Sequence, residues 1–320
     1  MLEFITRGLY HAGIHLSYAS FVWVTAWLLT SLLRGSATTK YWIWVATSLN
    51  FIVPLGALFD ALLKSRLGWA TPVGTVGDVA AQVSRGPAAP LFAVLWFAGA
   101  TIMFLRLGLR LQRERSAART SDEIGPVQNF ADSIPIRASE NTESPAVGGL
   151  LFPHIALPRG IERLLSEHEL NAVLIHELAH ARRRDNLIRL VHEVAACALW
   201  FHPLVWITGR RLALYRELSC DEAVVAKAQG EELVSALAKL ANPENGLLLQ
   251  ATATSFISHR LAGLRGTLPH PRNHAANLLL GAVFAAALAA GIFGTVSHTA
   301  CCFVTKELPT AAVCRGTAHR

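Results

Sequence analysis

The sequence predicts a mainly α-helical, polytopic membrane protein with an α+β domain between the third and fourth membrane spans. Three observations lead to this fold class. Of the 320 residues, 52% are hydrophobic and only 16% are charged, whereas a soluble chain usually carries about 25% charged residues. Four long runs contain no charged residue, and each is close to the roughly 20 residues that a helix needs to cross a bilayer. Arginine clusters flank two of these runs.

The four uncharged runs define the expected membrane helices. They are 24, 19, 20 and 22 residues long, and they cover 10–33, 41–59, 86–105 and 275–296. Buried core helices are the alternative explanation, but four such runs in one chain favour membrane spans. We therefore expect membrane helices over about 10–33, 41–62, 86–108 and 273–297.

The arginine clusters predict how these helices are oriented. Five arginines follow the third run within the next 14 residues, and three precede the fourth run. Cytoplasmic loops of membrane proteins are enriched in Lys and Arg. The helical segment 1–111 is therefore followed by a cytoplasmic domain over 112–272, and 298–320 form a short extracytoplasmic tail. A multi-pass protein of the cytoplasmic membrane is therefore expected.

Charge and cysteine usage narrow the function classes further. The net charge is +7, but it lies in arginine clusters beside apolar runs and no nucleic-acid-binding motif accompanies it, so direct nucleic-acid binding is disfavoured. No CxxC pair is present, so a thiolate zinc site is not expected. Cys301, Cys302 and Cys314 fall in the expected outer tail, where a disulfide to Cys314 and unpaired thiols remain equal alternatives.

The expected cytoplasmic domain begins with a polar linker over 112–142. The segment SPAVGGLLFPHIALP follows, and its short apolar runs between Pro and Gly predict one or two strands. Helices are expected after it. The 14-residue run Val194–Ile207 is too short to span a bilayer, so we expect an interfacial, re-entrant or buried helix with a kink at Pro203.

The stretch LSEHELNAVLIHELAHARRR carries the first candidate chemistry. Ser166 and Glu169 have the spacing of a capping box, which predicts that a helix begins there. On that helix His176 and His180 are four residues apart and face the same side. Two neutral imidazoles at this spacing can hold one zinc ion, and Glu177 can act as general base towards a water on that ion.

A catalytic zinc ion needs a third protein ligand, and RELSCDEAVV offers one. Glu217 and Asp221 are four apart on a predicted helix. Glu217 would complete a His-His-Glu set with an open fourth position. Asp221 would accept a hydrogen bond from a ligand imidazole and fix its tautomer. A solvated acidic helix face is the alternative for this pair.

Other residues are weaker candidates. Cys220 is expected to be a small buried residue. Tyr215 and His154 are both candidates to stabilise an oxyanion, and the sequence does not choose between them. The three arginines at 182–184 either bind acidic headgroups or solvate a helix end, with Asp185 as a partner for one of them.

The order HELAH, RRRDN, FHPLVW and RELSCDEAVV, with SPAVGGLLFPHIALP upstream, resembles the BlaR/MecR family of membrane zinc metallopeptidases over about residues 106–265. The resemblance implies a gluzincin-type fold and an edge strand over 146–158 onto which a substrate peptide can add. It also implies zinc ligands and a catalytic residue, namely His176, His180 and Glu217 as ligands and Glu177 as catalyst.

The resemblance breaks off after the last expected span. The β-lactam sensors of the family carry a penicillin-binding domain there, and the tail of this chain has no S-x-x-K motif. Sensing by direct acylation is therefore not expected. In those relatives the zinc domain is cleaved autolytically and signalling leads to the loss of a repressor. Self-cleavage near Ser255–Phe256 is the corresponding expectation for this chain.

The leading functional hypothesis is an integral-membrane zinc endopeptidase with a cytoplasmic active site and one zinc ion per chain. Its substrate would be a cytoplasmic regulatory protein such as a transcriptional repressor, the chain itself, or both. The first alternative is a transducer in which zinc only stabilises the fold and nothing is cleaved. The second is a structural membrane protein with a chance HELAH. A homodimer is left open.

Overall fold

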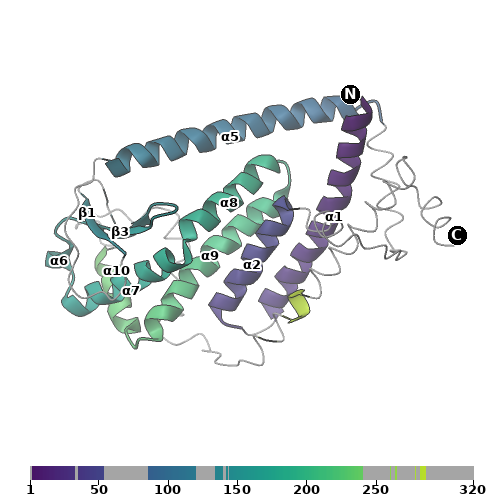
Figure 1. Ribbon diagram of the computed structural model, residues 1–320. Coiled ribbons are helices and arrows are strands. Elements are labelled where there is room, and N and C mark those ends of the chain that lie inside the picture. Colours follow the sequence, from purple (N-terminus) through teal and green to yellow (C-terminus); the bar gives the residue numbers. More distant parts are fainter. Residues whose placement is uncertain are drawn as a thin grey trace.

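The computed structural model describes residues 2–32, 35–53, 86–119, 134–139, 142, 144–240, 260, 264, 278 and 282–285. Four helices lie side by side, and α5 runs along one side of them (Figure 1). A small sheet and three further helices form the end of the molecule that lies away from the N-terminus. The four side-by-side helices are α1 (Leu2–Leu32), α2 (Ala37–Ile52), α8 (Asp185–Ala198) and α9 (Pro203–Val225).

The mainly α-helical character is confirmed. Among the residues that the structure describes, one helix, Ala89–Ser116 within α5 (Ala89–Arg119), is long and apolar enough to cross a membrane. Helices α1 and α2 occupy the places of the first two expected spans. Of the fourth expected span, over 273–297, the structure describes only residues 278 and 282–285, and these are helical. A multi-pass arrangement therefore remains a prediction.

The small sheet has three strands in the order β1-β3-β2. β1 (Ile136–Ser139) is parallel to β3 (His154–Pro158), and β2 (Ala146–Gly148) is antiparallel to β3. One or two strands were expected after the polar linker, and two are present, β2 and β3. The expectation of an edge strand over 146–158 holds for β2 but is wrong for β3. β3 is central because β1, which arises from the linker itself, pairs with its other side.

An apolar core fixes α7 (Glu167–Arg183) beneath the sheet and beside α10 (Gly230–Leu240). Leu157 of β3, Leu174 of α7 and Leu233 of α10 belong to one buried cluster. Ser166 caps α7, because its side chain accepts from the Glu169 amide while the Glu169 carboxylate accepts from the Ser166 amide. The predicted capping box is confirmed, and it sets where the HELAH turn lies.

The single kinked helix expected over Val194–Ile207 is wrong. α8 ends at Ala198 and α9 begins at Pro203, so the apolar run crosses a helix-turn-helix. Proline suits the first position of a helix, where its missing N–H needs no partner. The start of this turn contacts α5, since the indole of Trp96 on α5 donates to the Ala198 carbonyl at 2.8 Å.

Candidate metal centre

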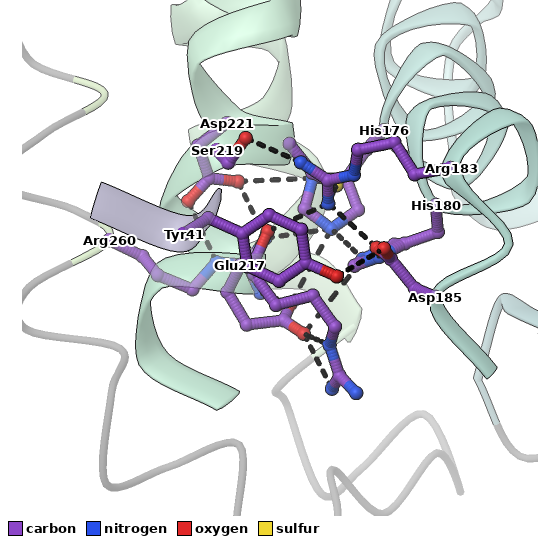
Figure 2. Close-up of polar contacts among 11 residues, drawn as sticks. Tyr41, His176, His180, Arg183, Asp185, Glu217, Ser219, Asp221 and Arg260 are labelled. Atoms are coloured by element: carbon purple, nitrogen blue, oxygen red, sulfur yellow. Dashed lines mark hydrogen bonds and ion pairs between the residues drawn. The ribbon is translucent and has the colours of Figure 1, made fainter. Parts of the chain in front are cut away.

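Three side chains from two helices converge on one point. His176 and His180 lie one turn apart on α7, and α9 brings Glu217 against them (Figure 2). The two imidazole Nε2 atoms are 3.2 Å apart. Oε2 of Glu217 is 3.5 Å from Nε2 of His176, and Oε1 is 3.8 Å from Nε2 of His180. The structure thus brings together the three ligands predicted from the sequence.

The outward nitrogen of each imidazole faces a carboxylate. Nδ1 of His176 is 3.1 Å from Oδ1 of Asp221, one turn beyond Glu217 on α9. Nδ1 of His180 is 2.6 Å from Oδ2 of Asp185. An Nδ1–H that donates to a carboxylate leaves the Nε2 lone pair free for a metal ion. The predicted place of Asp221 agrees with this geometry, whereas the role of Asp185 beside His180 was not foreseen.

Two arginines hold these carboxylates in place. Arg260 is buried and donates from Nε and Nη2 to the two oxygens of Asp221, each at 2.9 Å. Arg183 donates to Oδ2 of Asp185 at 2.6 Å, which confirms the expectation that Asp185 pairs with an arginine of 182–184. Both contacts are charge-assisted, and the one between Arg260 and Asp221 is also bidentate. Contacts of these kinds are among the stronger and more directional hydrogen bonds in proteins.

The donor set fits a zinc ion. Zinc–nitrogen bonds of about 2.0–2.1 Å in tetrahedral geometry place neighbouring donor atoms roughly 3.3 Å apart. The distances of 3.2, 3.5 and 3.8 Å between the three donor groups are close to that spacing. Two imidazoles and one carboxylate are also the ligand types found in catalytic zinc sites that keep a position open.

Cys220 is a competing third donor. Donor atoms of His176, His180 and Cys220 all lie within 4.8 Å of one another. Sγ of Cys220 accepts from Arg183 at 2.9 Å, however, and burial raises the pKa of the thiol. The carboxyl of Glu217 is ionised, since His176, His180 and Arg216 outweigh the effect of burial and hold its pKa well below the usual range. Glu217 is therefore the better anionic ligand.

Glu177 lines a cavity of about 380 Å³ beside the convergent donors. It is only 9% exposed. Pro145, just before β2, and Val147, within β2, also line this cavity. Asn186 donates from its amide to the carbonyls of Val147 and Gly149, at 2.8 and 3.1 Å, and so fastens β2 beside the start of α8. The cavity can hold a peptide segment between an edge strand and the candidate metal ligands.

Neither oxyanion candidate from the sequence lines this cavity. Tyr215 packs in the cluster that α9 shares with α1 and α2, and the His154 ring lies over Gly148 on the sheet. The cationic side chains that do line the cavity are Arg189, Arg216 and Arg260. No local sequence pattern identifies these arginines as cavity residues, because they lie far apart in the sequence. Ser255–Phe256 and the tail cysteines lie outside the described residues.

Metal uptake should depend on pH through His176. Burial lowers the pKa of this imidazole, but the carboxylates of Asp221 and Glu217 outweigh burial and raise it to about 9. Metal-free His176 is therefore protonated below about pH 9 and must lose that proton to bind zinc. We expect the apparent zinc affinity to rise by up to about tenfold per pH unit as pH increases towards 9, and then to level off.

Competition titrations against a zinc chelator across this pH range measure the effect. The protonated imidazole stabilises the metal-free fold fully below pH 6.5, and this contribution is lost as pH rises through about 9. Asp221→Asn removes one carboxylate that raises the pKa of His176, so the plateau should move to lower pH. An affinity that is flat with pH in the unsubstituted protein would contradict the expectation.

Comparison with known proteins gives a consistent family relationship. The model of the family described as BlaR1 peptidase M56 matches residues 14–264. Over 96 residues the chain is 35% identical to the regulatory protein BlaR1 of Bacillus licheniformis, and over 99 residues it is 27% identical to the methicillin resistance mecR1 protein of Staphylococcus aureus. These alignments cover 30% and 31% of this chain but only 16% and 17% of the relatives' lengths.

Proposed function

Because the chain belongs to the BlaR1 peptidase M56 family, we propose that it is an integral-membrane, zinc-dependent endopeptidase with a cytoplasmic active site. One observation carries the proposal. Two imidazole Nε2 atoms and the Glu217 carboxylate converge in a cavity that Glu177 also lines. The site residues are His176, His180 and Glu217 as ligands of one zinc ion, Glu177 as general base, and Asp221 as the partner that orients His176.

The arrangement supports hydrolysis of a peptide bond. When bound, zinc lowers the pKa of water and polarises the scissile carbonyl. Glu177 takes the proton from the attacking water and delivers it to the leaving amine. The substrate peptide lies in the cavity along β2, where backbone pairing with the edge strand aligns it. Arg216 and Arg260 line the same cavity and supply positive charge near the developing oxyanion.

The proposed place of the domain follows from the apolar helices. α5 exposes many large apolar side chains along its length, among them Leu91, Phe97 and Leu105. The C-terminal part of α5, which carries its arginines, ends near the small sheet (Figure 1), and arginine-rich ends of spans face the cytoplasm. We therefore place the metal centre in the cytoplasm of a bacterium, at the inner face of a multi-pass protein in the cytoplasmic membrane.

The substrate that we propose is a cytoplasmic regulatory protein, with a transcriptional repressor as the first candidate. Cleavage would convert a signal from the membrane into removal of that regulator. Self-cleavage near Ser255–Phe256 is a further part of the proposal. Mass spectrometry of the purified chain should then find a fragment that ends at Ser255, and its absence from active protein would remove self-cleavage from the scheme.

Removing the metal should abolish activity reversibly. A chelator should strip about one zinc ion per chain from the purified full-length protein, and cleavage of a peptide library should stop, since Glu177 alone cannot activate water at neutral pH. One equivalent of zinc should restore cleavage, whereas magnesium should not, because magnesium prefers oxygen ligands. Metal analysis together with mass spectrometry of the peptides tests this. A chain that purifies without zinc and binds none would sink the proposed function.

A further inference from the structure

A chain of buried side chains joins α2 to a candidate zinc ligand. Tyr41, in the second turn of α2, is 1% exposed, and its hydroxyl donates to Oδ1 of Asp185 at 2.8 Å (Figure 2). The other oxygen of Asp185 is 2.6 Å from Nδ1 of His180. Nε2 of the same imidazole faces the metal position. Three consecutive side chains therefore lead from a helix at the place of the second expected span to the metal centre.

Asp185 has little freedom to rearrange. Its Oδ2 contacts both His180 and Arg183, and its Oδ1 accepts from the Tyr41 hydroxyl. The Arg183 guanidinium also lies over the Tyr41 ring, 4.6 Å from its centre. The tyrosine thus fixes the carboxylate directly through its hydroxyl and indirectly through the arginine on its ring. A buried carboxylate that loses a donor will turn towards another partner, and its hold on the imidazole will change.

The same end of α2 is tied to α9, which carries the third ligand. The amides of Ala37 and Thr38 donate to the Glu222 carboxylate. The hydroxyls of Thr38 and Ser219 are 2.8 Å apart, and Ser219 in turn accepts from Arg183. Glu222 and Ser219 flank the turn of α9 that carries Cys220 and Asp221. A movement of α2 must therefore pull on both sides of the metal centre or break these contacts.

We propose that α2 couples the expected membrane helices to the metal centre. In this proposal Tyr41 is a positioning residue for His180, and it acts through Asp185. The inference rests on the proposed function in taking zinc as the ion. Displacement of α2 withdraws the Tyr41 hydroxyl, releases Asp185 and reorients His180. Metal binding and catalysis then change although the same three residues remain the ligands. Partners in this outer position set ring orientation and ligand basicity in zinc sites.

The test uses Tyr41→Phe in the full-length protein in lipid nanodiscs. The substitution keeps the ring under Arg183 and removes only the hydroxyl. We expect zinc affinity, measured by chelator competition, to fall roughly tenfold, since loss of an outer partner typically costs 10–100-fold. The absorption bands of the cobalt-substituted protein should shift as well, because they report the geometry of the ligands. Thr47→Val is the matched control, since among the described residues the buried Thr47 hydroxyl bonds the Ile43 carbonyl of its own helix and no residue of the metal centre.

A double-mutant comparison separates positioning from general support of the fold. Asp185→Asn should weaken zinc binding by itself, and Tyr41→Phe should add no further loss in that background if Tyr41 acts through Asp185. Equal, additive losses in both backgrounds would overturn the proposal. So would wild-type zinc affinity and cobalt spectrum in Tyr41→Phe. If Tyr41→Phe fails to fold, 3-fluorotyrosine at position 41 keeps the hydroxyl but makes it a more acidic and stronger donor to Asp185. The cobalt spectrum should then shift, and an unshifted spectrum counts against the proposal.

Failure of this inference can be told from failure of the proposed function. A wild-type protein that binds no zinc defeats the proposed function. A wild-type protein that binds zinc and cleaves peptides, with Tyr41→Phe indistinguishable from it, defeats only the coupling through Tyr41.

Discussion

Glu177→Gln is expected to abolish peptide hydrolysis while zinc stays bound. Glu177 follows the first candidate ligand on α7 and lines the cavity. Glutamine has nearly the same shape, but its amide cannot take a proton from water. General-base catalysis typically contributes 10²–10⁴-fold to a rate, so cleavage by the purified protein should fall by about that factor. Metal analysis should find the same zinc content as in the unsubstituted chain.

Glu167→Gln provides the matched control. It makes the same chemical change in the first turn of the same helix, but Glu167 is exposed and does not line the cavity. Activity should therefore be unchanged. In cells, quantitative proteomics of the Glu177→Gln strain should reveal a cytoplasmic protein that accumulates relative to both other strains, and that protein is the candidate substrate. Signalling that survives Glu177→Gln with zinc in place would instead support a non-proteolytic transducer.

Glu217→Ala is expected to remove zinc from the protein, whereas Cys220→Ala is not. Both residues lie near the two imidazoles, but Glu217 is an ionised carboxylate and Cys220 a buried neutral thiol. Loss of an outer partner already costs 10–100-fold in zinc affinity, so loss of a direct ligand should cost more than about 100-fold. Cys220→Ala should change the affinity by no more than roughly threefold.

Zinc content after dialysis and chelator competition measure both variants side by side. Circular dichroism of each metal-free variant checks that the helices persist, so that loss of zinc is not loss of fold. The reverse result, with zinc lost from Cys220→Ala and kept by Glu217→Ala, would assign the thiol as third ligand and would contradict the His-His-Glu set.

Much of the candidate metal centre could be predicted because its parts are local. A capping box fixes where α7 begins, and helical periodicity then puts His176 and His180 on one side. The same periodicity pairs Glu217 with Asp221 on α9. Each inference needs only residues within a turn or two of one another, so the sequence alone supplies it. That the two helices meet was inferred from the chemistry of zinc, which needs a third ligand.

Hydropathy was less successful at predicting where individual helices and strands begin and end. The run Val194–Ile207 is apolar throughout, yet it contains the end of α8, a turn and the start of α9. Hydropathy does not distinguish a turn buried among apolar neighbours from a continuous helix. β1 was missed for a related reason, because a four-residue strand in a polar segment is stabilised by pairing with β3 and not by its own composition.

By itself the sequence determined the mainly α-helical class, the helix that carries the two candidate histidine ligands, and the acidic pair that faces it. Only the tertiary structure decided what surrounds them. Tyr41 and Asp185 are 144 positions apart, and Arg260 and Asp221 are 39 apart. No periodicity links residues at such separations. Their contacts exist because apolar faces of α2, α7 and α9 pack together and leave these polar groups buried, where each must find the partner that the fold provides.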